Sequence, residues 1–162
     1  MHRVIVAEKI ADPGLDALRA AGHEVDVRTG LSPEELREAI AGASGLIVRS
    51  ATQVDAELIA AAGSSLAVVG RAGVGLDNVD TAAATANGVM VVNAPESNIT
   101  SAAEHTMALL LAQARNVPQA HSALVDGRWE RSKWEGVELE DKTLGVVGFG
   151  RIGRLVAHRA VA

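Results

Sequence analysis

Apolar residues in the first part of the chain fall into short runs, and longer segments with helical periodicity separate these runs. Runs without alternating polar residues are typical of strands that are buried on both faces of a parallel sheet. A weaker run covers Val25–Val27, so the pattern predicts five strands in total. The four stronger runs are Val4–Ala7, Leu46–Val48, Ala67–Val69 and Val89–Val92.

The segments between these runs carry signals of helix starts and ends. Pro13 and Pro33 stand where the first turn of a helix tolerates proline, and Ser32 with Glu35 forms a capping box. Alternating strands and helices predict right-handed crossovers, and hence an α/β fold in which helices cover both faces of a doubly wound sheet. Each helical segment ends at a glycine that can adopt the left-handed conformation, at Gly22, Gly42, Gly63 or Gly88.

The pattern changes after residue 98, where longer helical periodicity replaces the apolar runs. Ser101–Glu104 has the form of a second capping box and predicts the start of a long helix. Pro118 either ends this helix or begins the next short one. Residues 126–142 contain both tryptophans among alternating charges, which is typical of an arm or a loop. We therefore expect a domain boundary here, with residues 1–98 forming a flavodoxin-like parallel-sheet domain.

The last part of the chain has the strand–loop–helix pattern of a Rossmann domain. An apolar run over residues 142–147 predicts a strand, and Arg154–Ala162 predicts the helix that follows. Between them, Gly148–Gly153 matches the pattern GxGxxG, in which the glycines allow a tight turn, a close approach to a pyrophosphate and helix–strand packing. Residues 99–162 therefore have the pattern of the beginning of a nucleotide-binding domain. The alternative is a glycine-rich turn that binds no ligand.

Composition narrows the classes of protein to consider. Of the 162 residues, 48% are apolar, and the net charge of −5 argues against a nucleic-acid partner. The absence of cysteine excludes disulfide scaffolds and thiolate zinc sites, and we expect no metal site. Glu104 and His105 interrupt the most apolar segment before it reaches the length of a membrane span, so we expect no membrane partner and a cytoplasmic protein.

Basic and polar groups follow the predicted strands of the first domain. Arg49 follows the third strand, and Arg71 with the glycine-rich Gly73–Gly75 follows the fourth. Because the carboxyl ends of parallel strands meet at one edge, we expect guanidinium and backbone N–H groups to converge there on a small anion. Other interpretations stay open: Arg49 as an ion-pair partner of Asp55, Arg71 as a brace between domains, and the glycines as turn residues alone.

Several of these segments resemble a known family, the D-isomer-specific 2-hydroxyacid dehydrogenases. The similar segments are Val48–Thr52, Gly70–Asp80, Val92–Pro95 and Asp141–Gly145. The resemblance implies hydride transfer between a phosphorylated 2-hydroxy acid and the cofactor NAD. It also implies a substrate-binding domain over residues 1–98 and an NAD-binding Rossmann domain that begins at residue 99.

The same resemblance assigns site residues. For the substrate it implies Arg49, Ser50, Gly73, Val74 and Asn98. For the dinucleotide it implies Val74, Gly148, Gly150, Arg151, Ile152 and Gly153. The acidic residue that would distinguish NAD from NADP is expected about 20 positions after the glycine loop, which is beyond Ala162.

The catalytic arginine, glutamate and histidine of the family lie far downstream of the glycine loop, and none of them falls within this chain. The chain thus resembles an N-terminal fragment, and we expect it to be inactive alone. Its predicted strand over residues 143–148 would also lack neighbouring strands. The family usually forms dimers or tetramers, so we expect a homo-oligomer.

Three alternative functions remain. The first is a reductase of glyoxylate or hydroxypyruvate in the same family. The second is a non-catalytic, dinucleotide-sensing corepressor built on this fold. The third is a phospho-receiver module over residues 1–98, which requires an aspartate after the third strand and a lysine after the fifth. Because Arg49 and Asn93 occupy those places, the receiver is the weakest of the three.

Overall fold

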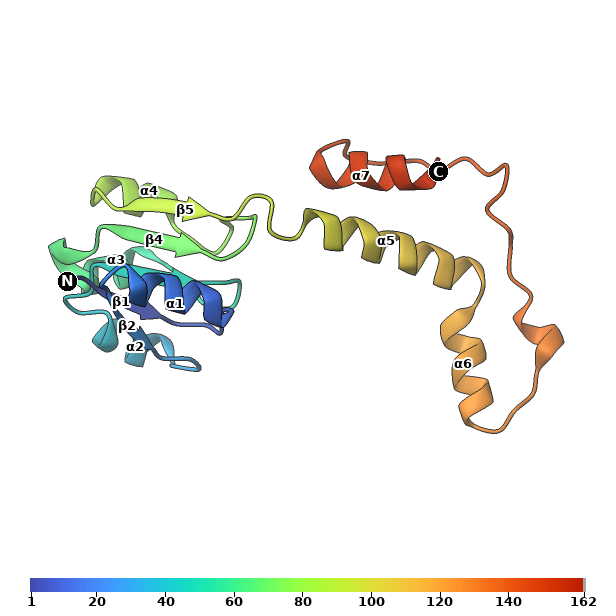
Figure 1. Ribbon diagram of the computed structural model, residues 1–162, viewed down its shortest axis with the longest axis horizontal. Helices are drawn as coiled ribbons and strands as arrows, with labels where there is room; N and C mark the ends of the chain where they lie inside the picture. The colour runs from blue at the N-terminus through green and yellow to red at the C-terminus, as the bar shows by residue number, and fades with distance from the viewer. Residues whose placement is uncertain (162) are drawn as a thin grey trace. The chain divides into compact units, whose positions relative to one another are not determined.

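The chain folds into two compact units, Met1–Ser97 and Asn98–Ala162 (Figure 1). The computed structural model describes residues 1–161, so the last residue of the predicted helix Arg154–Ala162 lies outside the described part. The division falls one residue before the boundary expected from the sequence, and it assigns Asn98 to the second unit.

A five-stranded parallel sheet forms the centre of the first unit, in the order β2-β1-β3-β4-β5. This is the strand order of flavodoxin-like folds, and the α/β prediction is confirmed. In this order the chain reverses its direction of winding between β1 and β3, and ligands of such sheets bind outside the carboxyl ends of the strands at this point. The strands are β1 (Arg3–Val6), β2 (Glu24–Val27), β3 (Gly45–Val48), β4 (Val68–Arg71) and β5 (Met90–Asn93).

Helix boundaries in the first unit follow the predicted capping signals. The Ser32–Glu35 capping box is confirmed, because the Ser32 hydroxyl accepts from the Glu35 N–H at 3.2 Å and the Glu35 carboxylate accepts from the Ser32 N–H at 2.8 Å. The four predicted terminal glycines all have positive φ. The helices are α1 (Asp12–Ala20), α2 (Pro33–Ala39), α3 (Ala56–Ala62) and α4 (Thr81–Ala86), and α3 continues into the 3-10 turn η1 (Gly63–Ser65).

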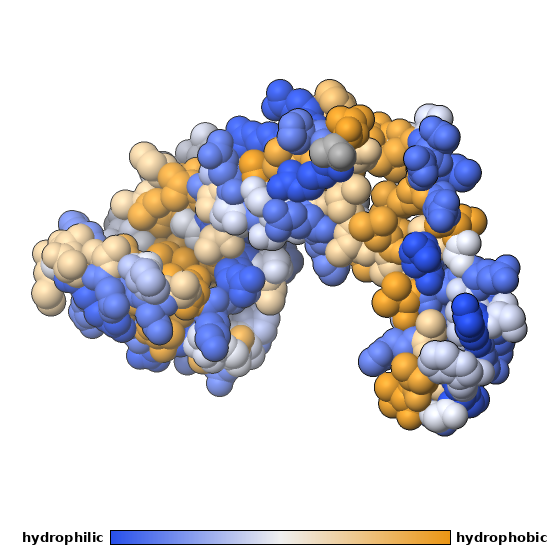
Figure 2. Space-filling model, turned by 45° about the vertical axis from the view of Figure 1, so that its right-hand side comes forward, coloured by the Kyte–Doolittle hydropathy of each residue, from blue (hydrophilic) through white to orange (hydrophobic). Residues whose placement is uncertain are grey.

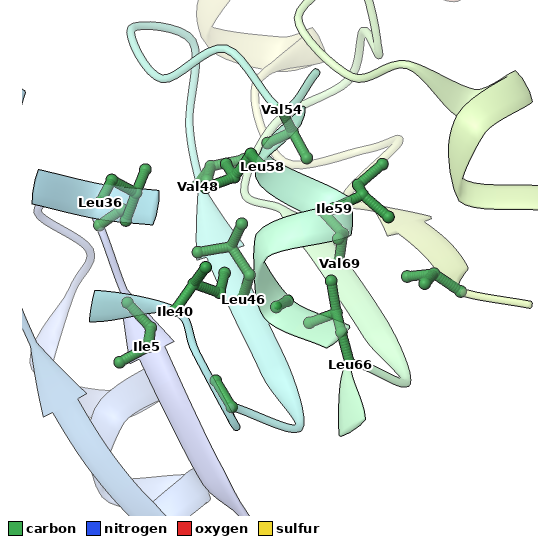
Figure 3. Packing of buried hydrophobic residues seen from close by; sticks show 14 of the residues in the cluster. Ile5, Leu36, Ile40, Leu46, Val48, Val54, Leu58, Ile59, Leu66 and Val69 are labelled. Atoms are coloured by element: carbon green, nitrogen blue, oxygen red, sulfur yellow. The ribbon is translucent and has the colours of Figure 1, made fainter. Parts of the chain in front are cut away.

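The main hydrophobic core lies on the sheet face that α2, α3 and α4 cover. Alternate strand residues such as Ile5, Leu46 and Val69 point into it and meet Ile40 and Ile59 from the helical layer (Figure 3). The intervening strand residues face the opposite side, where α1 packs. The core thus fixes the register of the strands and, with it, the loops at their carboxyl ends.

The second unit consists of helices joined by irregular segments. Its long helix begins at Ile99, with Asn98 as the N-cap, so the predicted capping box at Ser101–Glu104 is wrong. An N-cap residue stands just before the first helical residue, whereas Ser101 already lies inside the helix. Pro118 stands in the first turn of the next helix and begins it. The elements are α5 (Ile99–Ala114), α6 (Val117–Val125), the 3-10 turn η2 (Arg131–Trp134) and α7 (Arg151–Ala160).

The strand predicted over residues 142–147 is also wrong, since all strands within residues 1–161 belong to the first unit. A strand exists only where its backbone pairs with a neighbour, and this segment has none in the described part of the chain. Leu144 and Val147 are accordingly exposed. The helix after the glycine loop begins at Arg151, three residues before the predicted start.

Candidate functional site

The loops that follow β3 and β4 start side by side at the carboxyl edge of the sheet. Val48 pairs with Arg71 in the β3–β4 ladder, and the Ala72 N–H donates to the Val48 carbonyl at 2.8 Å. This register places the start of the 49–52 loop, with the exposed side chains of Arg49 and Ser50, next to the start of the glycine-rich segment. The pairing of β3 with β4 therefore brings the starts of these two polar loops to the same edge of the sheet.

Glu8, the second residue after β1, binds the backbone of the 49–52 loop. Its carboxylate accepts hydrogen bonds from the N–H groups of Arg49 at 2.8 Å and Thr52 at 3.0 Å. A third comes from the N–H of Ala51 at 3.3 Å. Burial raises the pKa of Glu8, but the hydrogen bonds from Thr52, Arg49 and Ala51 outweigh this, and the pKa lies below its ordinary value. Glu8 is thus a carboxylate at neutral pH.

Asn78 binds the same loop from its carbonyl side. Its side chain is 3% exposed, and its amide nitrogen donates to the carbonyls of Arg49 at 2.8 Å and Thr52 at 2.7 Å. The backbone carbonyl of Asn78 accepts from the Val54 N–H at 2.8 Å, next to an isolated parallel bridge between Val54 and Val79. The loop is therefore held on both its donor and its acceptor side.

The segment after β4 is tied to the end of β5. The Ala94 N–H donates to the Gly73 carbonyl at 2.9 Å, and the Asn93 amide donates to the Val74 carbonyl at 2.7 Å. The Gly73 N–H donates to the Arg71 carbonyl at 2.8 Å, so a ligand would have to compete for this group. The N–H of Val74 makes no backbone hydrogen bond within residues 1–161. Of the two N–H groups predicted to bind the substrate carboxylate, the N–H of Val74 is therefore the more available.

Gly73 leaves room for the end of a neighbouring side chain. A Cβ placed there would collide with the guanidinium of Arg71, which folds back over the glycine. The Nε of Arg71 is buried and has no hydrogen-bond partner in the described part of the chain. The glycine therefore allows a cationic side chain to lie against the backbone at the sheet edge.

The alternative partner for Arg49 is engaged elsewhere. Asp55 caps α3 by accepting from the Leu58 N–H at 2.8 Å, and it pairs with Arg37 at 3.4 Å. A cavity of about 550 Å³ lies between the 49–52 loop and α2, with Glu8, Thr52 and Arg37 in its wall. Arg49 and Ser50 are not among its lining residues, so the predicted substrate groups do not face this cavity.

In the second unit, the three glycines of the loop have three different environments. Gly148 has a φ of +91°, as a tight turn requires. A Cβ at Gly153 would collide with the Gly148 carbonyl oxygen, whereas a Cβ at Gly150 would meet no atom within 4 Å. These environments match three features of a dinucleotide loop: the tight turn, the close packing of the following helix on the loop, and the open approach to the backbone.

The loop leads directly into α7, whose first two residues are Arg151 and Ile152. The positive end of a helix dipole favours an anion, and Gly150 leaves the backbone open at the start of α7. The chemistry of this segment therefore fits a pyrophosphate. Asn98 caps α5 in this same unit, and its proximity to Arg49 stays a prediction.

The described residues lack both a membrane-spanning helix and a cluster of metal-binding side chains. Within residues 1–161 there is no helix long and apolar enough to cross a membrane. The same residues contain no group of three or more histidine, aspartate or glutamate side chains placed to hold a metal ion.

Sequence reasoning assigned no role to Glu8 or Asn78. The available signal for Glu8 was its position directly after a buried strand, where functional side chains of parallel sheets gather. Asn78 lies inside the Gly70–Asp80 segment on which the family resemblance rests. Its almost complete burial became evident only from the fold.

Comparisons with known proteins agree with this geometry. The chain is 51% identical over 160 residues to a D-3-phosphoglycerate dehydrogenase of Archaeoglobus fulgidus, and the match covers 99% of this chain and 30% of the relative. A Thermus thermophilus crystal structure matches with a TM-score of 0.91 at 40% identity, over 98% of this chain and 52% of that one. An NAD⁺-bound 3-phosphoglycerate dehydrogenase of Entamoeba histolytica matches with a TM-score of 0.79 at 29% identity, over 99% of this chain and 50% of that one.

The chain thus spans about half the length of these solved structures and less than a third of the curated relative. The family model for the catalytic domain of D-isomer specific 2-hydroxyacid dehydrogenases matches residues 4–148. That range includes the sheet, apart from Arg3 at its first strand, and both loops of its carboxyl edge. The chain therefore belongs to the D-isomer specific 2-hydroxyacid dehydrogenase family.

Proposed function

We propose that the full protein containing this chain oxidises 3-phospho-D-glycerate to 3-phosphohydroxypyruvate with NAD, a step toward L-serine. The observation that carries the proposal is the 51% identity over 160 residues to a protein named D-3-phosphoglycerate dehydrogenase. The substrate carries a phosphate and a carboxylate, and the sheet edge offers Arg49 and Arg71 as cations at neighbouring strand ends. A substrate with two anionic groups can therefore pair with the two guanidinium groups at this edge.

In this proposal each residue at the edge has a distinct task. The Arg49 guanidinium makes charge-assisted hydrogen bonds to an anionic group of the substrate, and the Ser50 hydroxyl adds a neutral one. The N–H of Val74 binds the carboxylate, with Gly73 allowing the backbone to come close. The family resemblance also assigns Asn98 to substrate binding.

The dinucleotide would be held by Val74 and by the loop residues Gly148, Gly150, Arg151, Ile152 and Gly153. When bound, NAD would supply the acceptor for the hydride that leaves C2 of the substrate. The hydroxyl proton must leave at the same time, which requires a base, and the developing carbonyl requires a cation. We assign these tasks to the family's histidine, its partner glutamate and an arginine, which the resemblance places outside residues 1–162. Residues 1–162 alone are therefore expected to turn over no substrate.

The proposal extends to the state of the full protein. We expect a homo-oligomer, a dimer or a tetramer, because the family resemblance implies one, and we keep the cytoplasm as the expected location. Size-exclusion chromatography with light scattering on the full protein measures the first directly, and a monomer at all concentrations contradicts it.

The test is an assay of the full protein for NADH formation with 3-phospho-D-glycerate, repeated with NADP in place of NAD. We expect NADH formation that requires the phosphorylated substrate. Faster reduction of glyoxylate or hydroxypyruvate would favour the reductase. Dinucleotide binding without turnover of any of these acids, together with dinucleotide-dependent capture of a peptide partner, would favour the corepressor.

A matched pair of variants connects the assay to the sheet edge. Arg49→Lys keeps the charge but loses the bidentate fork, so the KM for 3-phospho-D-glycerate should rise at least about tenfold. Arg19→Lys, on the exposed side of α1, is the control and should leave the KM unchanged. An unchanged KM in Arg49→Lys would remove Arg49 from the substrate site.

A further inference from the structure

We propose that Glu8 and Asn78 are positioning residues, which hold the backbone of residues 49–52 between them so that Arg49 and Ser50 face the substrate. Neither side chain needs to touch the substrate for this role. The inference rests on the proposed function, because it assumes that the presented groups bind an anionic substrate.

The position of Glu8 follows from the register of two neighbouring strands. β1 pairs with β3, and the Ala7 N–H extends this ladder by donating to the Ile47 carbonyl at 2.9 Å. Glu8 therefore leaves the sheet opposite the start of the 49–52 loop. From there its carboxylate reaches three backbone N–H groups, the shortest contact being 2.8 Å to the N–H of Arg49.

Three converging N–H groups would otherwise form an anion-binding nest. A carboxylate suits the nest because it only accepts hydrogen bonds and has two oxygens to share among the three donors. With Glu8 in this place, an anion of the substrate meets the Arg49 side chain and not the backbone of the loop. Glu8 thus determines which group of the loop is available to a ligand.

Asn78 completes the arrangement on the opposite side. Its amide donates to the carbonyls of Arg49 and Thr52, which are the first and last residues of the loop. The side chain is almost fully buried, so water cannot replace it at low cost. An aspartate would have nearly the same shape, but it would place a carboxylate against two carbonyl oxygens.

Glu8 binds N–H groups of the loop and Asn78 binds its carbonyl groups, so the loop backbone has little freedom. The exposed side chains of Arg49 and Ser50 therefore extend from fixed backbone positions. A pre-organised loop loses less conformational entropy when a ligand binds, and this gain appears as affinity. A variant in which the loop is no longer pre-organised should bind the substrate more weakly, with little change in the rate of the chemical step.

The test uses the full protein and the variants Glu8→Gln, Glu8→Ala and Asn78→Asp. Glu34→Gln is the matched control, since Glu34 is an exposed carboxylate that lines the same cavity as Glu8. In Glu8→Gln we expect the KM for 3-phospho-D-glycerate to rise about tenfold, while kcat and the KM for NAD change less than about twofold. Amide exchange at residues 49, 51 and 52 should accelerate in the same variant, and Glu34→Gln should change none of these quantities.

Chemical rescue provides an independent readout. Glu8→Ala empties the nest, so added acetate should occupy it, slow the amide exchange at residues 49, 51 and 52 and lower the KM toward the wild-type value. Asn78→Asp should raise the same KM without any response to acetate. Rescue of the KM in Glu8→Ala alone would show that the carboxylate in the nest, and not general damage to the fold, determines substrate affinity.

Several results would overturn the inference. One is a wild-type KM together with wild-type exchange in Glu8→Gln. Another is a parallel loss of kcat, substrate affinity and NAD affinity, which would indicate general damage to the fold. If the wild-type protein does not oxidise 3-phospho-D-glycerate, the proposed function fails. The effect of Glu8 on the loop is then still decided by amide exchange and acetate rescue, which need no turnover.

Discussion

Both units contain helices with periodic apolar residues, but the first unit buries its large apolar side chains and the second leaves most of them exposed. In the first unit, Ile5, Leu46 and Val69 are almost completely buried between sheet and helices. In the second, Ala103, Ala123 and Val156 are the buried apolar residues within residues 98–161. Larger apolar side chains of this unit lie exposed, and Figure 2 shows apolar surface in the α5–α6 part of the chain. Periodicity thus creates helices, but a core requires a second layer to cover them.

The strongest test of this contrast compares one leucine from each unit. Leu46, 1% exposed, lies in the middle of β3, and Leu124, 56% exposed, lies on α6. Leu46→Ala should lower the free energy of unfolding of the first unit by about 2–5 kcal/mol, because it leaves a cavity. Leu124→Ala should change stability by about 0.5 kcal/mol or less.

The two units can be followed separately in this experiment. Both tryptophans, Trp129 and Trp134, belong to the second unit, so their fluorescence reports on that unit alone. Amide exchange in β1, β3 and β4 reports on the first. Equal destabilisation by the two leucine variants would contradict the contrast between a covered and an uncovered unit.

The second unit does contain one tightly packed point, at the glycine loop. Gly153→Ala would push a Cβ into the Gly148 carbonyl, and we expect a loss of about 1–3 kcal/mol in the stability of the loop and α7. Gly150→Ala has open space around its Cβ, so it should keep this stability and weaken NAD binding instead.

Thermal unfolding and NAD titration of the full protein separate the two effects. Gly145→Ala is the control for both, because a Cβ there also meets no atom within 4 Å and the residue precedes the loop. Tight NAD binding by Gly150→Ala would contradict the proposal that the pyrophosphate of NAD lies close to the backbone at Gly150.

Helix capping gives a smaller effect that also differs between the units. Ser32→Ala removes the hydroxyl that accepts from the Glu35 N–H in the capping box at α2, and it should cost about 1 kcal/mol. Ser101→Ala replaces a residue inside α5 by a better helix former and should leave the stability within about 0.5 kcal/mol of wild type. A larger loss in Ser101→Ala than in Ser32→Ala, measured by urea denaturation, would restore the capping box predicted at Ser101.

The sequence was most informative where structure depends on neighbours along the chain. The apolar runs located all five strands of the sheet, and the terminal glycines located the helix ends. Ser32 and Ser101 show the limit of this reasoning, since both begin the same short motif. Ser32 stands just before the first residue of its helix, where its hydroxyl accepts from the Glu35 N–H. The helix at Ser101, by contrast, had already begun at Ile99.

Features that depend on distant parts of the chain were not predictable in the same way. The apolar run over residues 142–147 has the composition of a strand, but no strand of the described residues pairs with it. For the candidate site, Arg49 could be predicted from its position after a strand. Its support by Glu8 could not, because that contact joins residues 41 positions apart through the β1–β3 register.

Acid titration of Glu8 is expected to give the smallest effect, since burial and hydrogen bonding shift its pKa in opposite directions. Burial raises the pKa, and the hydrogen bonds from Thr52, Arg49 and Ala51 lower it below the ordinary value of 4.5. A carboxyl with a lowered pKa stabilises the fold above its unfolded pKa, and this contribution is lost as the pH falls through the folded pKa. Amide exchange at residues 49, 51 and 52, corrected for the intrinsic rate, should therefore accelerate in acid in the wild type. In Glu8→Gln it should be fast at every pH, and an acid-dependent step that survives in this variant would assign the titration to another group.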